Sequence, residues 1–180
     1  MTTSSTARPT RTPRKEPVFS PDLLSGQVVI VTGGGSGLGL AMSQGLCSAG
    51  AQVVICGRSP ERLGKAVETL RSLGGKVSGI PCDVRDPAEI DQLVRKTVEQ
   101  HGKIDGLINN AAGNFLCAAE DLSAGGFDAV VKIVLYGSVN ATLAVGRHLI
   151  GRGAPGSVLS ILTPYAWTGS AFVLPSACAK

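Results

Sequence analysis

The sequence predicts an α/β protein built around one parallel, doubly wound sheet. Short apolar runs alternate along the chain with longer segments in which apolar residues recur about every 3.6 positions. The short runs are apolar at nearly every position, which is typical of strands covered on both faces, as in parallel sheets. Glycine is also frequent, at 24 of 180 residues without a fixed period, and this indicates tight turns and close backbone approach.

Strands and helices are expected to alternate from residue 28 onward. The apolar runs predict strands at residues 28–31, 53–56, 77–82, 104–108 and 158–162. The amphipathic segments predict helices at residues 38–49, 60–73, 87–101 and 127–150. Pro60 and Pro87 suit the first helical turn, and Gly50, Gly74 and Gly102 suit helix ends. Because parallel strands require right-handed crossovers, the simplest architecture is a Rossmann-type sheet with its ligand crevice at the carboxyl ends of the strands.

The first 21 residues differ in composition from the rest of the chain. They are rich in Thr, Ser, Pro and Arg and lack apolar periodicity, so we expect a disordered tail before one domain at residues 22–180. The alternative is an organelle transit peptide, but the prolines disfavour the amphipathic helix that such a peptide forms. The segment has no apolar core of a signal peptide, so secretion is not expected.

Charge and cysteine content narrow the classes of function. The formal net charge is +4, and four cations against Glu16 place +3 of it in the first twenty residues, so nucleic-acid binding through bulk charge is not expected. No apolar run approaches the roughly 18 residues of a membrane span. The five cysteines form no C-x-x-C pair, which favours buried thiols in the reducing cytoplasm over a disulfide framework or a metal site.

A glycine-rich loop, T-G-G-G-S-G-L-G at residues 32–39, joins the first strand to the first helix. Glycines in this context let the backbone turn sharply and let a diphosphate approach the amide groups at the helix N-terminus. The alternative is a glycine-rich turn without a ligand. The residues expected to hold the dinucleotide here are Thr32, Gly33, Ser36, Gly37, Leu38 and Gly39.

The second strand ends in Gly57-Arg58-Ser59, without the acid that binds the ribose hydroxyls in NAD-binding units. A guanidinium at this place can bind a 2′-phosphate through charge-assisted hydrogen bonds, so NADP(H) is favoured, with Arg58 and Ser59 as ligands. The alternative for Arg58 is a solvated loop arginine. After the third strand, Asp83 and Val84 are expected to contact adenine, unless Asp83 instead starts the next helix.

Three segments resemble the short-chain dehydrogenase/reductase superfamily. They are the T-G-x-x-x-G-x-G loop, the pair Asp83-Val84, and N-N-A-A-G at residues 109–113 after the fourth strand. The resemblance covers about residue 24 to residue 180 and implies a nicotinamide cofactor. It adds three residues to the cofactor site, namely Asn110, Ala111 and Gly113.

A narrower resemblance is to the NADPH-dependent 2,4-dienoyl-CoA reductases. It rests on N-N-A-A-G-N-F at residues 109–115, Y-A-x-T-G-S at residues 165–170 and P-S-A-x-A-K at residues 175–180. The resemblance implies an oxidoreductase of fatty acid metabolism, auxiliary to β-oxidation, with an acyl-CoA as substrate.

The catalytic helix departs from the superfamily's usual tyrosine and lysine four residues apart. Ser176 and Lys180 stand in those places and share one helix face. A serine is too short and too weak an acid to replace a phenol. In the dienoyl-CoA reductases that this chain resembles, the tyrosine comes from upstream, at the position of Tyr165. The resemblance therefore assigns the oxyanion donors to Tyr165 and Asn114, the nicotinamide ribose to Lys180, and a supporting role to Ser176.

The chemistry of a conjugated diene explains why the tyrosine can move. Hydride delivery to the far end of the diene places negative charge on the thioester oxygen, so the reaction needs two donors at that oxygen, and water protonates the dienolate. The alternative interpretations are a loop aromatic for Tyr165, a turn residue for Asn114 and a surface lysine for Lys180.

Two features depart from the family pattern. The superfamily usually has an Asn in the long helix after the fourth strand, where the matching stretch 134–137 has Tyr136. The chain also ends at Lys180, where family members continue, so we expect a Rossmann-type domain that is truncated on its C-terminal side. The alternatives to a dienoyl-CoA reductase are a general carbonyl or 3-oxoacyl reductase and a fragment that binds nucleotide weakly without turnover.

The resemblance also implies assembly and location. Family members form homo-oligomers, so a tetramer is expected for the full-length protein. The expected location is the cytoplasm, with mitochondria or peroxisomes as the alternative for a eukaryotic member.

Overall fold

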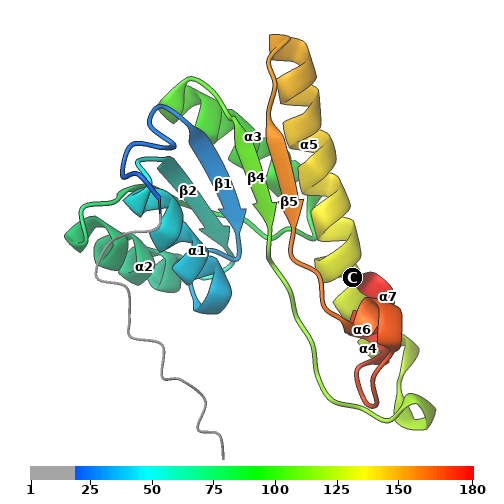
Figure 1. Cartoon of the computed structure of the whole chain (residues 1–180). Coiled ribbons are helices and arrows are strands. Elements are labelled where there is room, and N and C mark those ends of the chain that lie inside the picture. Colours follow the sequence, from blue (N-terminus) through cyan, green and yellow to red (C-terminus); the bar gives the residue numbers. More distant parts are fainter. Residues whose placement is uncertain (1–18) are drawn as a thin grey trace, which may run out of the picture.

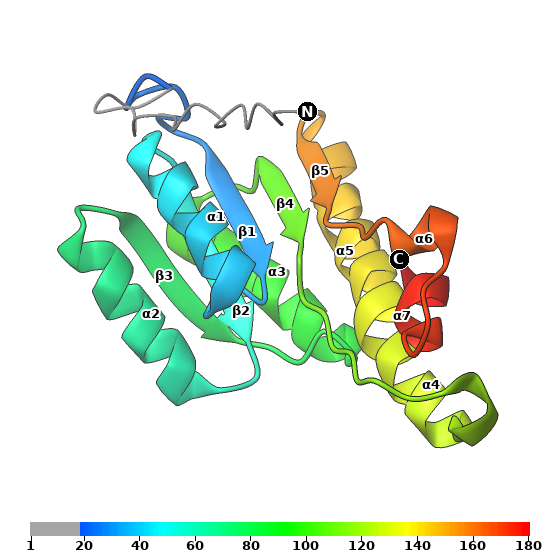
Figure 2. The same cartoon turned by 60° about the horizontal axis from the view of Figure 1, so that its bottom comes forward.

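The computed structural model describes residues 19–180, and within them parallel strands form one sheet in the order β3-β2-β1-β4-β5 (Figures 1 and 2). The chain builds the sheet outward from β1 to β3, then returns to the other side of β1 for β4 and β5. This reversal beside the first strand is the doubly wound topology expected from the sequence. The predicted fold class is confirmed. The expected tail, residues 1–21, lies almost wholly outside the described residues.

The strands differ in burial according to their place in the sheet. β1 (Val28–Thr32), β2 (Gln52–Gly57) and β4 (Gly106–Asn109) form the buried centre. β3 (Lys76–Pro81) and β5 (Ser157–Ser160) form the edges. All lie within two residues of the predicted positions, but the expectation that every strand is covered on both faces is wrong. β3 is partly exposed and β5 is exposed along its whole length, and both are edge strands with a neighbouring strand on one side only.

Two helices cover each face of the sheet. α1 (Gly37–Ser48) and α2 (Pro60–Ser72) pack on one face, where Leu63 and Leu70 join the apolar side chains of β1 and β2. α3 (Pro87–His101) and α5 (Gly137–Arg152) cover the other face (Figure 2).

The predicted helix boundaries have identifiable local causes. Pro60 and Pro87 are the first residues of α2 and α3, where a missing N–H costs no hydrogen bond. Gly50, Gly74 and Gly102, just after three helices, have φ values of 90°, 84° and 77°. Glycine adopts this left-handed conformation without the steric cost of a side chain, so these residues end the helices as predicted.

The predicted helix at 127–150 is part of a longer element. α4 (Ala124–Val131) continues through a π-helical turn, η2 (Lys132–Tyr136), into α5. By length and composition alone, the combined helix at Ala124–Arg152 is long and apolar enough to cross a membrane. The sequence did not predict this, because the apolar residues of the helix are interrupted by polar ones. One face packs on the sheet in the core. On the other face, Leu143 and Ile150 are exposed. Packing in the core therefore explains only some of the apolar residues of this helix.

Short helices complete the described part of the chain. η1 (Ala119–Asp121) precedes α4, and α6 (Tyr165–Thr168) and α7 (Leu174–Ala179) follow β5. Both views show α4, α6 and α7 gathered at the start of α5, away from α1 and α2 (Figures 1 and 2).

Asp105 links the amino ends of three strands. Its carboxylate accepts a hydrogen bond from the backbone N–H of Val28 (2.9 Å) and pairs with Lys103 (3.0 Å) and Arg152 (3.3 Å). Its backbone bonds to Val28 of β1 and to Ser157 of β5. Burial alone would raise the pKa of this carboxyl, but the Val28 hydrogen bond and the two cations outweigh it and lower the pKa below the usual aspartate range.

We expect the Asp105 carboxylate to make folding sensitive to acid. Because its pKa is lowered in the folded state, its stabilisation is fully present above the unfolded value of about 3.9 and is lost as the pH falls through the lower folded value. Asp105→Asn should therefore lower the free energy of unfolding at pH 7 by about 1.5–3 kcal/mol and should flatten its pH dependence below about pH 4. Urea unfolding measured between pH 2.5 and 7 tests this.

Asp128→Asn is the control for that measurement. Asp128 pairs with Lys132 one helical turn away and is exposed, so its removal should change stability little. An Asp105→Asn protein with the wild-type pH profile would contradict the assignment.

Candidate cofactor and catalytic site

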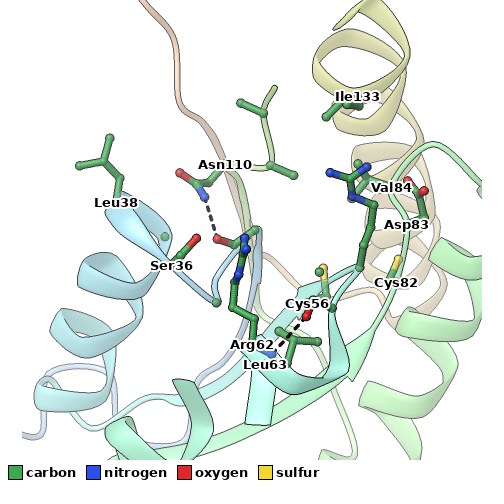
Figure 3. Close-up of a pocket in the computed structure, with 18 residues that line it drawn as sticks. Ser36, Leu38, Cys56, Arg62, Leu63, Cys82, Asp83, Val84, Asn110 and Ile133 are labelled. Carbon is green, nitrogen blue, oxygen red and sulfur yellow. Dashed lines mark hydrogen bonds between the residues drawn. The ribbon is translucent and has the colours of Figure 1, made fainter. Parts of the chain in front are cut away.

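A cavity of about 530 Å³ opens at the carboxyl ends of the central strands (Figure 3). Its walls come from the loop after β1, the end of β2 with the first turn of α2, the segment after β3, and the segment after β4. Ile133, from the π-helical turn η2, completes the wall. This is the place where open α/β sheets bind ligands, and it is where the sequence placed the crevice.

The glycine loop needs glycine because other groups lie where a side chain would be. A Cβ on Gly34 would lie 2.5 Å from Cγ2 of Ile55. A Cβ on Gly39 would overlap the carbonyl oxygen of Gly33 and lie 2.6 Å from Nδ2 of Asn110. Gly33 also has a φ of 67°, which disfavours any side chain. The loop therefore presents backbone to the cavity, as a diphosphate site requires.

Hydrogen bonds fasten this loop to the segment after β4. The Thr32 hydroxyl accepts from the backbone N–H groups of Asn110 and Ala111, both at 3.0 Å. The Asn110 side chain donates back to the carbonyl oxygens of Thr32 (3.0 Å) and Gly33 (3.3 Å). Thr32 is itself buried, so its part in the site is to position the two segments rather than to touch a ligand.

Two arginines reach the cavity from the end of β2. Arg58 was predicted there, whereas Arg62, in the first turn of α2, was not. Ser59 lines the cavity and also caps α2, because its hydroxyl accepts a hydrogen bond from the backbone N–H of Arg62 (3.2 Å). The sequence does hold a signal for Arg62, because it follows Arg58 by four residues, about one helical turn.

Asp83 lines the cavity and does not start the next helix. The residue that caps α3 is Asp86, which accepts from the backbone N–H of Ala88 at 2.8 Å, so the alternative interpretation of Asp83 is wrong. Hydrogen bonds from Arg85 to both carboxylate oxygens lower the pKa of Asp83, and the charge of Arg58 contributes. The group therefore presents an anionic acceptor at the cavity wall.

Cys56, in β2, and Cys82, directly after β3, form part of the cavity wall. A hydrogen bond between the two thiols, together with burial, raises the pKa of Cys56 well above its usual value, so this thiol stays protonated and unreactive. The expectation of buried thiols holds for these two but is wrong for Cys178, which is exposed on α7. A cysteine's burial depends on which face of its element packs, and sequence neighbours do not reveal this for a short helix.

Most of the predicted cofactor residues meet at this cavity. Those that line it are Gly33, Ser36, Leu38, Gly39, Arg58, Ser59, Asp83, Val84, Asn110 and Ala111. Those that do not are Thr32, Gly37, Gly113 and Lys180. Gly113 lies behind the wall, where a Cβ would come 3.2 Å from Cδ1 of Ile133.

The predicted catalytic residues lie on a second group of segments. Asn114 is exposed in the loop after β4, Tyr165 begins α6 and is 41% exposed, and Ser176 is half-buried on α7. The backbone N–H of Cys117 donates to the carbonyl oxygen of Phe172 (3.0 Å), which fastens the Asn114 loop to the segment between α6 and α7. Phe172 has a φ of 63°, a strained value for a residue with a side chain.

Lys180 points into a different hollow from the cofactor residues. Its Nζ donates to the carbonyl oxygen of Ile161 (2.5 Å), and burial lowers the pKa of the ammonium. It lines a mostly apolar cavity of about 290 Å³ between α5, the end of β5 and α7. The structure thus brings the segments of Asn114, Tyr165 and Ser176 together but does not place the four catalytic candidates in one cavity with the cofactor residues.

Comparison with known proteins identifies relatives that match most of the chain. The family described as short chain dehydrogenase matches residues 27–180. A probable 2,4-dienoyl-CoA reductase of Bacillus subtilis is 38% identical over 154 residues, which cover 86% of this chain and 61% of that protein. A peroxisomal 2,4-dienoyl-CoA reductase of Arabidopsis thaliana is 40% identical over 170 residues, covering 90% of this chain and 57% of the relative. The chain therefore spans about three fifths of the length of these relatives.

A solved structure agrees with the sequence relatives. The crystal structure of a short chain dehydrogenase from Bacillus anthracis is 41% identical and superposes with a TM-score of 0.83, covering 86% of this chain and 64% of the other. The glycine loop, the Asp83-Val84 pair and the segment after β4, which carried the resemblance in the sequence, all border the cavity of this fold. The chain belongs to the short chain dehydrogenase family.

Proposed function

We propose that the protein is a reductase that uses NADPH to reduce 2,4-dienoyl-CoA thioesters. The observation that carries the cofactor assignment is the end of β2, where Arg58 and not an acid faces the cavity. The substrate assignment is supported by the two relatives named 2,4-dienoyl-CoA reductase. It is also supported by the upstream Tyr165 and by Ser176, which the resemblance places where the superfamily usually has tyrosine.

The cavity fits the adenosine diphosphate half of the cofactor. The glycines at positions 33, 35 and 39 leave the backbone of this loop open to a diphosphate, and Ser36 and Leu38 supply its side chains on the cavity wall. Asp83 supplies an acceptor for an adenine amino group, and Arg58 supplies donors for a 2′-phosphate. The bound nicotinamide would supply the hydride, and Lys180 is the residue proposed to hold its ribose.

The proposed roles of the catalytic residues follow from where charge develops. When the far carbon of the diene gains a hydride, the electron pair moves through the conjugated system to the thioester oxygen. Tyr165 and Asn114 would donate hydrogen bonds to that oxygen and lower the energy of the dienolate. A proton from water then completes the reduction, so no side chain has to give up its own proton. Ser176, on α7, would support Tyr165 on the neighbouring α6.

A substrate comparison tests the proposed reaction. In a protein that also carries the C-terminal part of the relatives, NADPH oxidation should be fast with a 2,4-dienoyl-CoA and slow with a 3-oxoacyl-CoA. The second reaction needs a phenol to protonate the reduced carbonyl, and Ser176 stands in the place of that phenol. Faster turnover of the 3-oxoacyl-CoA would contradict the proposal and favour a general carbonyl reductase.

Assembly of the full-length protein into a homo-oligomer stays a prediction.

We expect Arg58→Ala to lower the preference for NADPH over NADH. The loss should be about 1.5–3 kcal/mol, the range for hydrogen bonds to a charged group, and should fall on NADPH alone because NADH has no 2′-phosphate. Fluorescence titration of the purified chain with each cofactor measures both affinities. An unchanged affinity ratio in the variant would show that Arg58 is a solvated loop residue.

A further inference from the structure

Arg62 is a charged residue of the cavity wall that has no role in the proposed reaction or in the cofactor site proposed above. It stands in the first turn of α2, and its side chain projects into the cavity (Figure 3). The stem of the side chain lies against the glycine loop, since a Cβ on Gly35 would come within 3.7 Å of Cγ of Arg62. The side chain therefore starts beside the loop expected to bind the diphosphate and reaches the same cavity as the end of β2.

No carboxylate of the described residues neutralises this guanidinium. Within residues 19–180, Arg62 forms no ion pair, and its neighbour Glu61 is already paired with Lys65 at 2.7 Å. The one acid on the cavity wall, Asp83, holds Arg85 through both of its oxygens. Two arginines thus face one cavity whose single carboxylate is hydrogen-bonded to a third arginine, Arg85.

This charge distribution favours an anion between the two arginines. Guanidinium groups that face a common space repel each other, and a bound anion with several acceptor oxygens relieves the repulsion. The glycine loop itself, residues 33–39, carries no cationic side chain, so a phosphate near it has no other cation on the loop side. A phosphate on the adenosine ribose would lie beside the end of β2, where both arginines reach.

We propose that Arg62 is a second specificity residue, which binds the 2′-phosphate of the adenosine ribose from the glycine-loop side while Arg58 binds it from the side of β2. The inference rests on the proposed use of NADPH. It assigns cofactor choice to two arginines four residues apart, one in the loop and one on the helix. The hydroxyl of Ser59 accepts from the backbone N–H of Arg62, which fixes the start of the helix that carries this side chain.

The test measures binding alone, with the 180-residue chain. Arg62→Ala should weaken NADPH binding about tenfold or more and change NADH binding less than about twofold. Adenosine 2′-monophosphate, added as a competitor of NADPH, should lose affinity by a similar factor, and adenosine 5′-monophosphate should not. Arg95→Ala is the matched control, because Arg95 is exposed on α3 and lies outside the cavity. Thermal unfolding shows whether each variant is folded, and the exposed side chain of Arg62 should be dispensable for folding.

The outcomes separate this inference from the proposed function. If the wild-type chain binds NADH as tightly as NADPH, the proposed cofactor is wrong. If it prefers NADPH and Arg58→Ala removes the preference while Arg62→Ala matches Arg95→Ala, only the role of Arg62 is overturned. Equal weakening of NADPH, NADH and adenosine 5′-monophosphate in Arg62→Ala would place the guanidinium on the diphosphate and also overturn the assignment.

Discussion

Replacing Tyr165 by Phe is expected to slow the reduction of a 2,4-dienoyl-CoA about a hundredfold or more. The phenol hydroxyl is proposed as one of two donors to the thioester oxygen, and removing one oxyanion donor from an enzyme typically has an effect of this size. The exchange removes one oxygen atom and keeps the ring, so the packing of α6 should persist. Initial rates of NADPH oxidation, in a protein that carries the C-terminal part of the relatives, measure the effect.

Two comparisons make this result specific to the phenol. Ser176→Ala should reduce the rate less, because the serine is assigned a supporting role. NADPH affinity should be unchanged in Tyr165→Phe, because Tyr165 lies outside the cavity proposed to hold the adenosine half. Equal rates for Tyr165→Phe and the wild type would remove the reason for placing the chain with the dienoyl-CoA reductases rather than with general reductases.

Gly39→Ala is expected to abolish measurable cofactor binding and to destabilise the fold by about 1–3 kcal/mol. The added methyl group would overlap the carbonyl oxygen of Gly33 and crowd the side chain of Asn110. Both groups belong to the hydrogen-bonded connection between the glycine loop and the segment after β4, so the loop must shift to make room. A shifted loop no longer presents its amide groups to a diphosphate. Urea unfolding and NADPH titration measure the two effects.

Gly45→Ala on the same helix is the matched control. A Cβ on Gly45 meets no atom within 4 Å, so alanine should stabilise α1 by about 0.5–1 kcal/mol through its better helix propensity. Cofactor binding should be kept. If Gly39→Ala behaved like Gly45→Ala, cofactor binding would not depend on the short distance between Gly39 and the carbonyl oxygen of Gly33.

Much of the cofactor site was predictable because its signals are local. The glycine loop stands directly between a strand and a helix, and the residues after β2 and β3 must emerge at the same edge of a parallel sheet. Arg58 and Asp83 could therefore be assigned to one crevice although 25 residues separate them. Pro60 and Gly102 marked helix ends for equally local reasons, a missing N–H and a positive φ.

The rest of the site depends on contacts between distant segments. Ile133 reaches the cofactor cavity from a π-helical turn that follows α4, and nothing in its sequence neighbourhood indicates that direction. Lys180 shares its helix face with Ser176 in the sequence pattern, yet its Nζ bonds to the carbonyl oxygen of Ile161 in a separate hollow. Spacing along a helix predicts which side chains share a face, but the packing of that helix decides what the face meets.

The sequence by itself determined the α/β order, the strand and helix positions, the glycine loop and the absence of an acid after β2. These features follow from periodicity, glycine and proline conformations and the fixed edge of a parallel sheet, all of which act within a few residues or through one crossover. The tertiary structure alone decided that Arg62 faces the same cavity as Arg58, that Asp83 is held by Arg85, and that β5 is exposed. The reason is that burial and charge neutralisation depend on which side chains meet in space. The amino-acid sequence alone does not show which distant residues those are.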